Sequence, residues 1–147
     1  MVIDAEGQVV GRLSSFIAKR ALLGEEVVVV NAGKAIVSGK KEFIIRSELD
    51  KFHRRNKASP LRGPFHYKQP DRFVRKKIRG MLPYKMTRGR EAFDRVMVYS
   101  GIPKDEIMKK HNIDLDKEKI HSLDKANAIH NNHMTVEEIC KAIGGRL

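Results

Sequence analysis

The densest group of chemically active side chains lies between residues 51 and 90. This segment holds fourteen Lys and Arg residues against a single acid, Asp71, which gives it a net charge of +13. The rest of the chain has a net charge of −1, so the +12 of the whole protein comes from this one segment. Ordinary solvated surfaces mix both signs. Because so many like charges repel one another unless a polyanion neutralises them, the segment predicts a polyanionic partner.

The aromatic side chains of the same segment favour RNA over a membrane surface. Rings that alternate with cations can stack on unpaired bases, as can the flat guanidinium of Arg. Phe52 and Phe73 are expected to pack inward. His66 and Tyr67 lie in a stretch rich in Gly and Pro, where we expect exposure. The sequence also lacks an apolar run of the roughly 20 residues that a membrane-spanning helix needs.

Other chemistries find little support in the residue pattern. Gly7 and Gly11 have the spacing GxxxG and not GxGxxG, so a plain turn is expected there and not a dinucleotide site. His130 and His133 lack a third metal ligand at suitable spacing, so we expect exposed loop histidines. The single cysteine, Cys140, is expected to be a buried, inert thiol. No catalytic residue, metal or cofactor is therefore predicted.

Hydrophobic periodicity and turn residues predict alternating strands and helices. The expected strands are 2–3, 27–30 and 96–99, with a short extended piece or a tight turn at 35–37. Residues 103–110 should form one or two helical turns, and 58–70 an irregular loop. The expected helices are 10–23, 40–56, 71–80, 89–95 and a last one that ends at 144–145. This order indicates an α/β sandwich with a largely parallel sheet.

Three of these helices carry specific side-chain predictions. Ser38 is expected to cap the helix at 40–56, whose buried stripe would be Ile45, Leu49 and Phe52. Thr135 and Glu138 have the spacing of a capping box for the last helix. In the helix at 71–80, Val74 and Ile78 fall on one face. The opposite face would then carry a cationic ridge formed by Arg72, Arg75, Lys76 and Arg79.

The length of the chain and its first residues indicate how many domains it has and in which compartment it works. The 147 residues fit a single domain, expected over 1–147, with a helical tail at 104–147. The first residues have neither the basic start nor the apolar core of a signal peptide, and one cysteine indicates a reducing compartment. A cytoplasmic location is therefore expected.

Several sequence blocks, in order along residues 2–103, resemble the ribosomal protein L13 family. The most distinctive block is Arg-Gly-Met-Leu-Pro-Tyr-Lys at 79–85. The others are VIDAEG at 2–7, GRLSS at 11–15, VVVVNAGKAIVSG at 27–39, Arg-Gly at 88–89 and VYSGIP at 98–103. The direct start at the first strand and the basic central section are similar to the archaeal type of this family.

The resemblance implies a structural, non-catalytic component of the large ribosomal subunit that binds large-subunit rRNA and helps early assembly. It implies a three-layer α/β/α sandwich around a four-stranded, mostly parallel sheet, with a basic loop and helix extension. Neighbouring large-subunit proteins would be partners, whereas a membrane and a small-molecule substrate would not. The expected rRNA contacts are Arg54, Arg55, Lys57, Arg62, His66, Tyr67, Lys68, Arg72, Arg75, Lys76, Arg79, Lys85, Arg88 and Arg90.

Two other functions compete with this interpretation. An enzyme that acts on RNA or nucleotides would need acids, histidines or metal ligands near the basic residues, and the sequence shows none there. A regulatory RNA-binding protein that works outside the ribosome is compatible with the sequence as an additional role.

Overall fold

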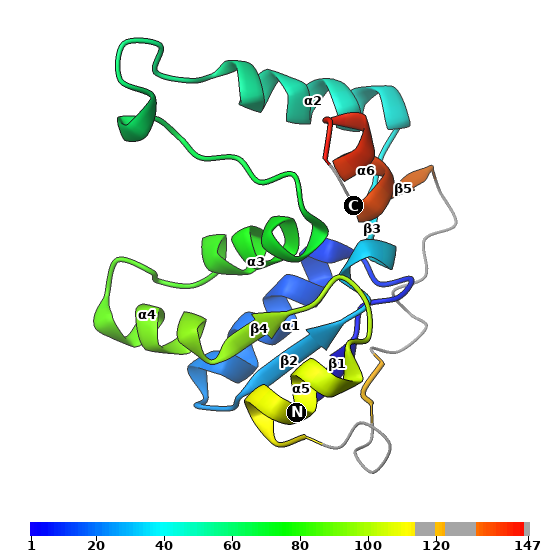
Figure 1. The fold of residues 1–147 in the computed structure, drawn as a ribbon, viewed down its shortest axis with the longest axis vertical. Coiled ribbons are helices and arrows are strands. Elements are labelled where there is room, and N and C mark those ends of the chain that lie inside the picture. The colour runs from blue at the N-terminus through cyan, green and yellow to red at the C-terminus, as the bar shows by residue number, and fades with distance from the viewer. Residues whose placement is uncertain (114–119, 123–131, 146–147) are drawn as a thin grey trace.

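The computed structural model describes residues 1–113, 120–122 and 132–145 of the chain. Within these residues the chain forms a mixed α/β fold (Figure 1). The strands are β1 Val2–Asp4, β2 Val27–Val30, β3 Ile36–Ser38, β4 Val96–Val98 and β5 His133–Thr135. The helices are α1 Val10–Leu22, α2 Lys41–His53, α3 Pro70–Gly80, α4 Thr87–Asp94, α5 Lys104–His111 and α6 Val136–Ala142. Two short 3-10 turns, η1 Ala32–Lys34 and η2 Pro60–Arg62, complete the elements.

The centre of the fold is a parallel sheet in which β2 lies between β1 and β4. Val28 of β2 pairs with Val2 on one side and with Met97 on the other. All four valines of β2 are buried. A run of β-branched residues suits a strand that is covered on both faces, which confirms the expectation for residues 27–30.

The two faces of this sheet contact different helices. On one face Ile3, Val27 and Val29 belong to the main hydrophobic core, to which α1 and α3 also contribute buried side chains. On the other face Val2, Val28 and Val30 form a smaller cluster with Ile107 of α5. The helix α3 is therefore held against the core, which fixes the position of its exposed face.

The sheet has three parallel strands in the part of the chain that the structure describes, where four were expected. Residues 36–38 do not join it and pair antiparallel with β5 in a separate sheet. The reason lies directly after β2, where Asn31 adopts a left-handed conformation (φ 57°) and the turn η1 redirects the chain. A single parallel bridge between Ile3 and His121 adds to the outer edge of β1.

The predicted cap of α2 is wrong, although the helix begins at Lys41, within one residue of the expected position. Ser38 lies in β3 opposite His133, and the helix begins after Lys40, which makes no side-chain cap. Ile44 is the buried residue of this helix, while the predicted stripe of Ile45, Leu49 and Phe52 is only half-buried. The helix lies at the edge of the molecule, so it buries a narrow strip only (Figure 1).

The C-terminal segment returns to the domain. The capping box of α6 is confirmed, since the Glu138 amide donates to Thr135 Oγ1 at 3.2 Å and the Thr135 amide donates to Glu138 Oε2 at 3.2 Å. Val136, Ile139 and Cys140 of this helix enter the main core. Residues 132–145 are therefore part of the same packed unit as the N-terminal strands and helices. His130 lies outside the described residues.

Candidate nucleic-acid interface

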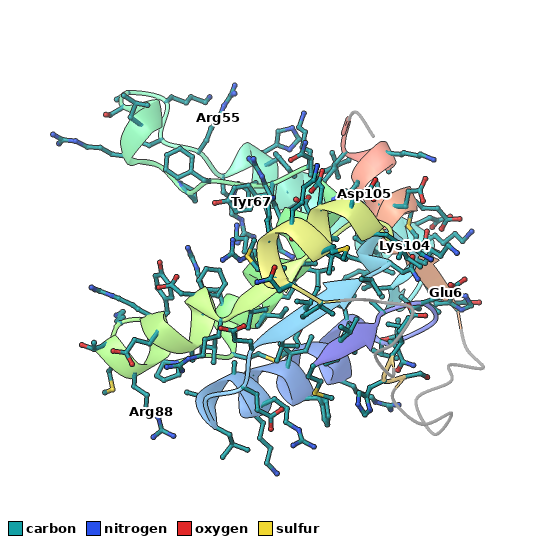
Figure 2. All side chains as sticks on the ribbon, turned by 60° about the horizontal axis from the view of Figure 1, so that its bottom comes forward. Glu6, Arg55, Tyr67, Arg88, Lys104 and Asp105 are labelled. Carbon is teal, nitrogen blue, oxygen red and sulfur yellow. The ribbon has the colours of Figure 1, made fainter. Side chains whose placement is uncertain are left out.

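The cations of residues 51–90 are spread over three consecutive pieces of structure. Apart from Lys51, which lies in α2, they belong to the basic arm (residues 54–69), to α3 and to α4 with the turn before it. The basic arm leaves the body of the protein between α2 and α3 and extends away from the sheet (Figure 1). Figure 2 shows Arg55 and Arg88 on one side of the molecule and Glu6 and Asp105 on the other.

The helix α3 presents cations because its other face is anchored. Pro70 occupies its first turn and Asp71 adds a negative charge there, both of which favour a helix start. Phe73, Val74 and Ile78 are buried in the core. The opposite face carries the basic ridge, which we define as Arg72, Arg75, Lys76 and Arg79. The amphipathic pattern expected from the sequence is thereby confirmed.

Two arginines of the basic ridge lie over aromatic rings. The guanidinium of Arg75 is 4.6 Å from the ring centre of Phe93, and that of Arg79 is 4.9 Å from the ring centre of Tyr84. The two rings meet edge to face at 5.4 Å and 89°. Such contacts hold an arginine against the surface without neutralising its charge. Phe93, on α4, was not predicted as a site residue, and its aromatic type inside an expected helix was the only signal for it.

Lys76 connects the basic ridge to the basic arm. Its Nζ donates a hydrogen bond to the Phe65 carbonyl oxygen at 2.7 Å and lies 5.8 Å from the ring centre of Tyr67. Burial lowers the pKa of Lys76, and the neighbouring charges of Arg79 and Lys77 lower it further. An approaching phosphate would offset this repulsion, so the local electrostatics favour an anion.

His66 and Tyr67 differ from each other in exposure, although both were expected to be exposed. His66 is half-buried, with its ring 5.1 Å from that of Phe52, and its Nε2 is buried without a hydrogen-bond partner in the described residues. Burial and then the charge of Lys76 lower the pKa of His66. Phe52 is half-buried and Phe73 is buried, so the inward packing expected for both is complete only for Phe73.

The end of the basic arm is tied to the C-terminal helix. Lys68 Nζ donates to the Gly144 carbonyl oxygen at 3.5 Å and lies 5.7 Å from the ring centre of Phe52. At Gly145, an added Cβ would lie 2.4 Å from the Lys68 carbonyl oxygen, so the two backbones are in close contact. Lys68 thus contacts protein in this structure, unlike the cations at the start of the arm.

The predicted contact residues form no ion pairs with the described acids. This holds for all twelve Lys and Arg residues of the predicted set. Elsewhere acids do pair with cations, as Glu25 with Arg20 at 3.0 Å and Glu6 with Lys34 at 3.0 Å. Glu48 of α2 pairs with Lys51 at 2.6 Å and with Lys77 at 3.5 Å, and neither of these cations was predicted as a contact. The positive charge of the predicted set is therefore not compensated by ion pairs with the described acids.

The turn before α4 and the first residues of α4 carry the remaining predicted cations. Lys85, Arg88 and Arg90 are exposed, and α4 starts two residues earlier than expected, at Thr87. Gly89 lies so close to this turn that an added Cβ would be 2.1 Å from the Pro83 carbonyl oxygen. This close packing fixes the turn, with Tyr84 and Lys85 in it, against α4.

Comparison with known proteins decides which family has this arrangement. The family model described as "Ribosomal protein L13" matches residues 1–105. The chain belongs to the ribosomal protein L13 family. The large ribosomal subunit protein uL13 of Methanocaldococcus jannaschii is 42% identical over 146 residues, which cover 99% of this chain and 98% of that protein. The uL13 protein of Thermoplasma volcanium is 42% identical over 145 residues, 98% of each chain.

A further relative is also similar to this chain over nearly its whole length, including the C-terminal third. The uL13 protein of Methanopyrus kandleri is 41% identical over 143 residues, which cover 97% of this chain and 86% of that protein. The similarity to L13 proteins thus continues past residue 103, where the sequence blocks quoted above end. In the structure, Met134, Val136, Ile139 and Cys140 of this C-terminal part belong to the main hydrophobic core.

Membership of the L13 family also decides between a structural protein and an enzyme. The family is one of structural ribosomal proteins, so the chain is not an enzyme. In the described ranges, no three His, Cys, Asp or Glu side chains lie together so that they could hold a metal ion. None of the helices described here is long and apolar enough to cross a bilayer. Cys140 is fully buried, and burial, with the charge of Asp71 next, raises its pKa to about 11.

Proposed function

We propose that this chain binds large-subunit rRNA through residues 51–90 and supports early assembly of the subunit. The observation that carries the proposal is the set of twelve cations on the basic arm, α3, α4 and the turn before α4, none of which forms an ion pair with an acid that the structure describes. Structural ribosomal proteins of archaea work in the cytoplasm, and the family places this chain there. The rRNA-contact residues are those predicted from the sequence.

The shape of the site supports contacts with a folded RNA. The core holds the basic ridge in a fixed position, while the basic arm extends from the body (Figure 1). A rigid charged face and an extended basic segment can together touch phosphates from RNA segments that lie apart. Such bridging would favour the compact form of the RNA, which is the physical basis for a role in early assembly.

The proposal extends to protein neighbours and to the layers around the sheet. We infer that neighbouring large-subunit proteins contact the chain, since exposed apolar side chains such as Phe43 and Met108 lie outside the basic segment. We also infer that the sheet belongs to a three-layer sandwich with a fourth strand. The bridge at His121 and the packing of α5 on the second sheet face support this inference.

The test is the salt dependence of RNA affinity. A protein that neutralises 6–10 phosphates loses about 10³- to 10⁵-fold in affinity between 50 and 200 mM salt. Replacement of the four ridge cations by Gln should lower the affinity and reduce the slope of log K against log salt by up to about 4.

A matched control removes the same charge elsewhere. Four exposed lysines outside residues 51–90, Lys19, Lys40, Lys41 and Lys109, are replaced by Gln in a second variant. The net charge of the two variants is equal, so only the position of the cations differs. The proposal predicts that the control keeps most of the wild-type slope. An equal loss in both variants, or no loss in the ridge variant, would contradict the assignment.

A further inference from the structure

A hollow of about 440 Å³ lies beside the basic ridge. Its lining combines the four cations of the ridge with three aromatic rings, those of Tyr67, Tyr84 and Phe93. The rings come from three separate segments, namely the end of the basic arm, the turn before α4, and α4 itself. The volume is within the range of about 300–1,000 Å³ of sites that hold small molecules.

The hollow is lined by aromatic rings as well as by the cations that binding of RNA phosphates alone would require. Phosphates need cations or amide groups, whereas a nucleobase is held by flat surfaces and by groups that bond its edge. Here Phe93 and Tyr84 meet at right angles, and each has an arginine over its face, Arg75 at 4.6 Å and Arg79 at 4.9 Å. A guanidinium that lies on a ring has a second flat side on which a base can stack.

One polar group of the walls also lacks a protein partner among the described residues. Arg75 Nε is buried and has no hydrogen-bond partner among the described residues. Among the described residues, no acid lines the hollow. A ligand that enters must therefore supply acceptors or negative charge as well as a flat surface. A nucleotide supplies all three, with the base as the flat surface and the phosphate as the charge.

We propose that this hollow receives one unstacked nucleotide of the bound RNA, with its base against the aromatic and arginine surfaces and its phosphate on the basic ridge. This inference rests on the proposed RNA-binding function and gives it a specific subsite. It assigns Tyr67, Tyr84 and Phe93 a role in affinity that does not depend on salt.

The test compares RNA with a chain that has the same phosphates and no bases. Octamers of adenylate and of uridylate are titrated against full-length protein beside an eight-residue abasic ribose-phosphate chain. Stacking of one base contributes about a 5- to 150-fold gain in affinity. We expect the wild-type protein to prefer the octamers by a factor in this range, with equal salt slopes for all three ligands.

The variants Tyr84→Leu and Tyr67→Leu localise the effect. Their side chains are 39% and 36% exposed, so the fold should tolerate either change, and thermal melting verifies this. We expect each to lower the preference for bases toward one without a change in salt slope. Phe43→Leu removes an exposed ring from α2, outside the hollow, and should leave the preference unchanged.

The outcomes separate this inference from the proposed function. If wild-type protein binds the abasic chain as tightly as RNA, or if the Tyr84 and Tyr67 variants keep the full preference, the nucleotide subsite is wrong. The steep salt dependence would then still support RNA binding through phosphates. If the protein shows neither a preference for bases nor a steep salt slope, both the subsite and the proposed function fail.

Discussion

The contact between Gly89 and the turn at residues 81–86 gives a sharp prediction for the variant Gly89→Ala. Gly89 lies in the first turn of α4 and is buried. An added Cβ would meet the Pro83 carbonyl oxygen at 2.1 Å, the Pro83 carbonyl carbon at 2.3 Å and the Tyr84 nitrogen at 2.9 Å. All three are backbone atoms, so relief requires that the turn or the helix moves.

Two opposing free-energy terms decide the outcome. Alanine is the better helix former, which contributes up to about 1 kcal/mol in its favour. Overpacking against a fixed neighbour costs about 1–3 kcal/mol and sometimes more. Because the clash is with backbone, we expect the upper end of this range and a net loss of about 2 kcal/mol in unfolding free energy. At about 3 °C per kcal/mol for a chain of this size, the melting temperature should fall by about 6 °C.

A second glycine offers the matched control. Gly11 also lies in the first turn of a helix, α1, and an added Cβ there would meet nothing within 4 Å. Gly11→Ala should therefore leave the melting temperature unchanged or raise it by a few degrees. Thermal unfolding followed by circular dichroism measures both variants. A Gly89→Ala protein as stable as the wild type would refute the close packing of α4 against the turn that holds Tyr84.

Two further predictions concern the basic arm and the buried thiol. The amides of Ala58 and Ser59 donate to Asn56 Oδ1 and the amide of Arg62 donates to the Ser59 carbonyl oxygen, so these hydrogen bonds are all local. We therefore expect residues 58–70 to exchange amide hydrogens much faster than Val27–Val30 in the free protein and to become protected in assembled subunits. Equal protection of the two segments in the free protein would contradict this. Cys140 should resist alkylation at pH 8 until the protein unfolds, and rapid alkylation of native protein would show that the thiol is exposed. Folding raises the pKa of Cys140 from about 9 to about 11. Its contribution to the free energy of unfolding should therefore be complete below pH 9 and be lost as the pH rises toward 11.

The elements predictable from sequence were those whose signal is local. The four valines of β2, the face of α3 with Val74 and Ile78, and the capping box at Thr135 each depend on residues close together in the chain. The basic ridge followed directly, because a helix with one buried face must expose the other. These local patterns were sufficient to place the four cations of the basic ridge on one face of α3.

The features that sequence reasoning missed depend on distant contacts. The pairing of β3 with β5 joins residues that are far apart in the chain, for example Val37 and Met134, and no local pattern encodes it. That pairing also takes Ser38 away from its expected role as a cap. The arginine stacked on Phe93 and the half-buried ring of His66 likewise result from tertiary packing between segments.

The most direct test of the account is retention in large subunits washed at high salt. Tagged copies of the wild-type chain and of the variant with Gln at Arg72, Arg75, Lys76 and Arg79 are expressed side by side in an archaeal host, and the large subunits are isolated and washed. We predict that the wild-type chain sediments with the large subunit after the wash, while the variant is depleted. Absence of the wild-type chain from washed large subunits, or equal retention of both copies, would contradict the claim that the basic ridge holds this protein on its RNA.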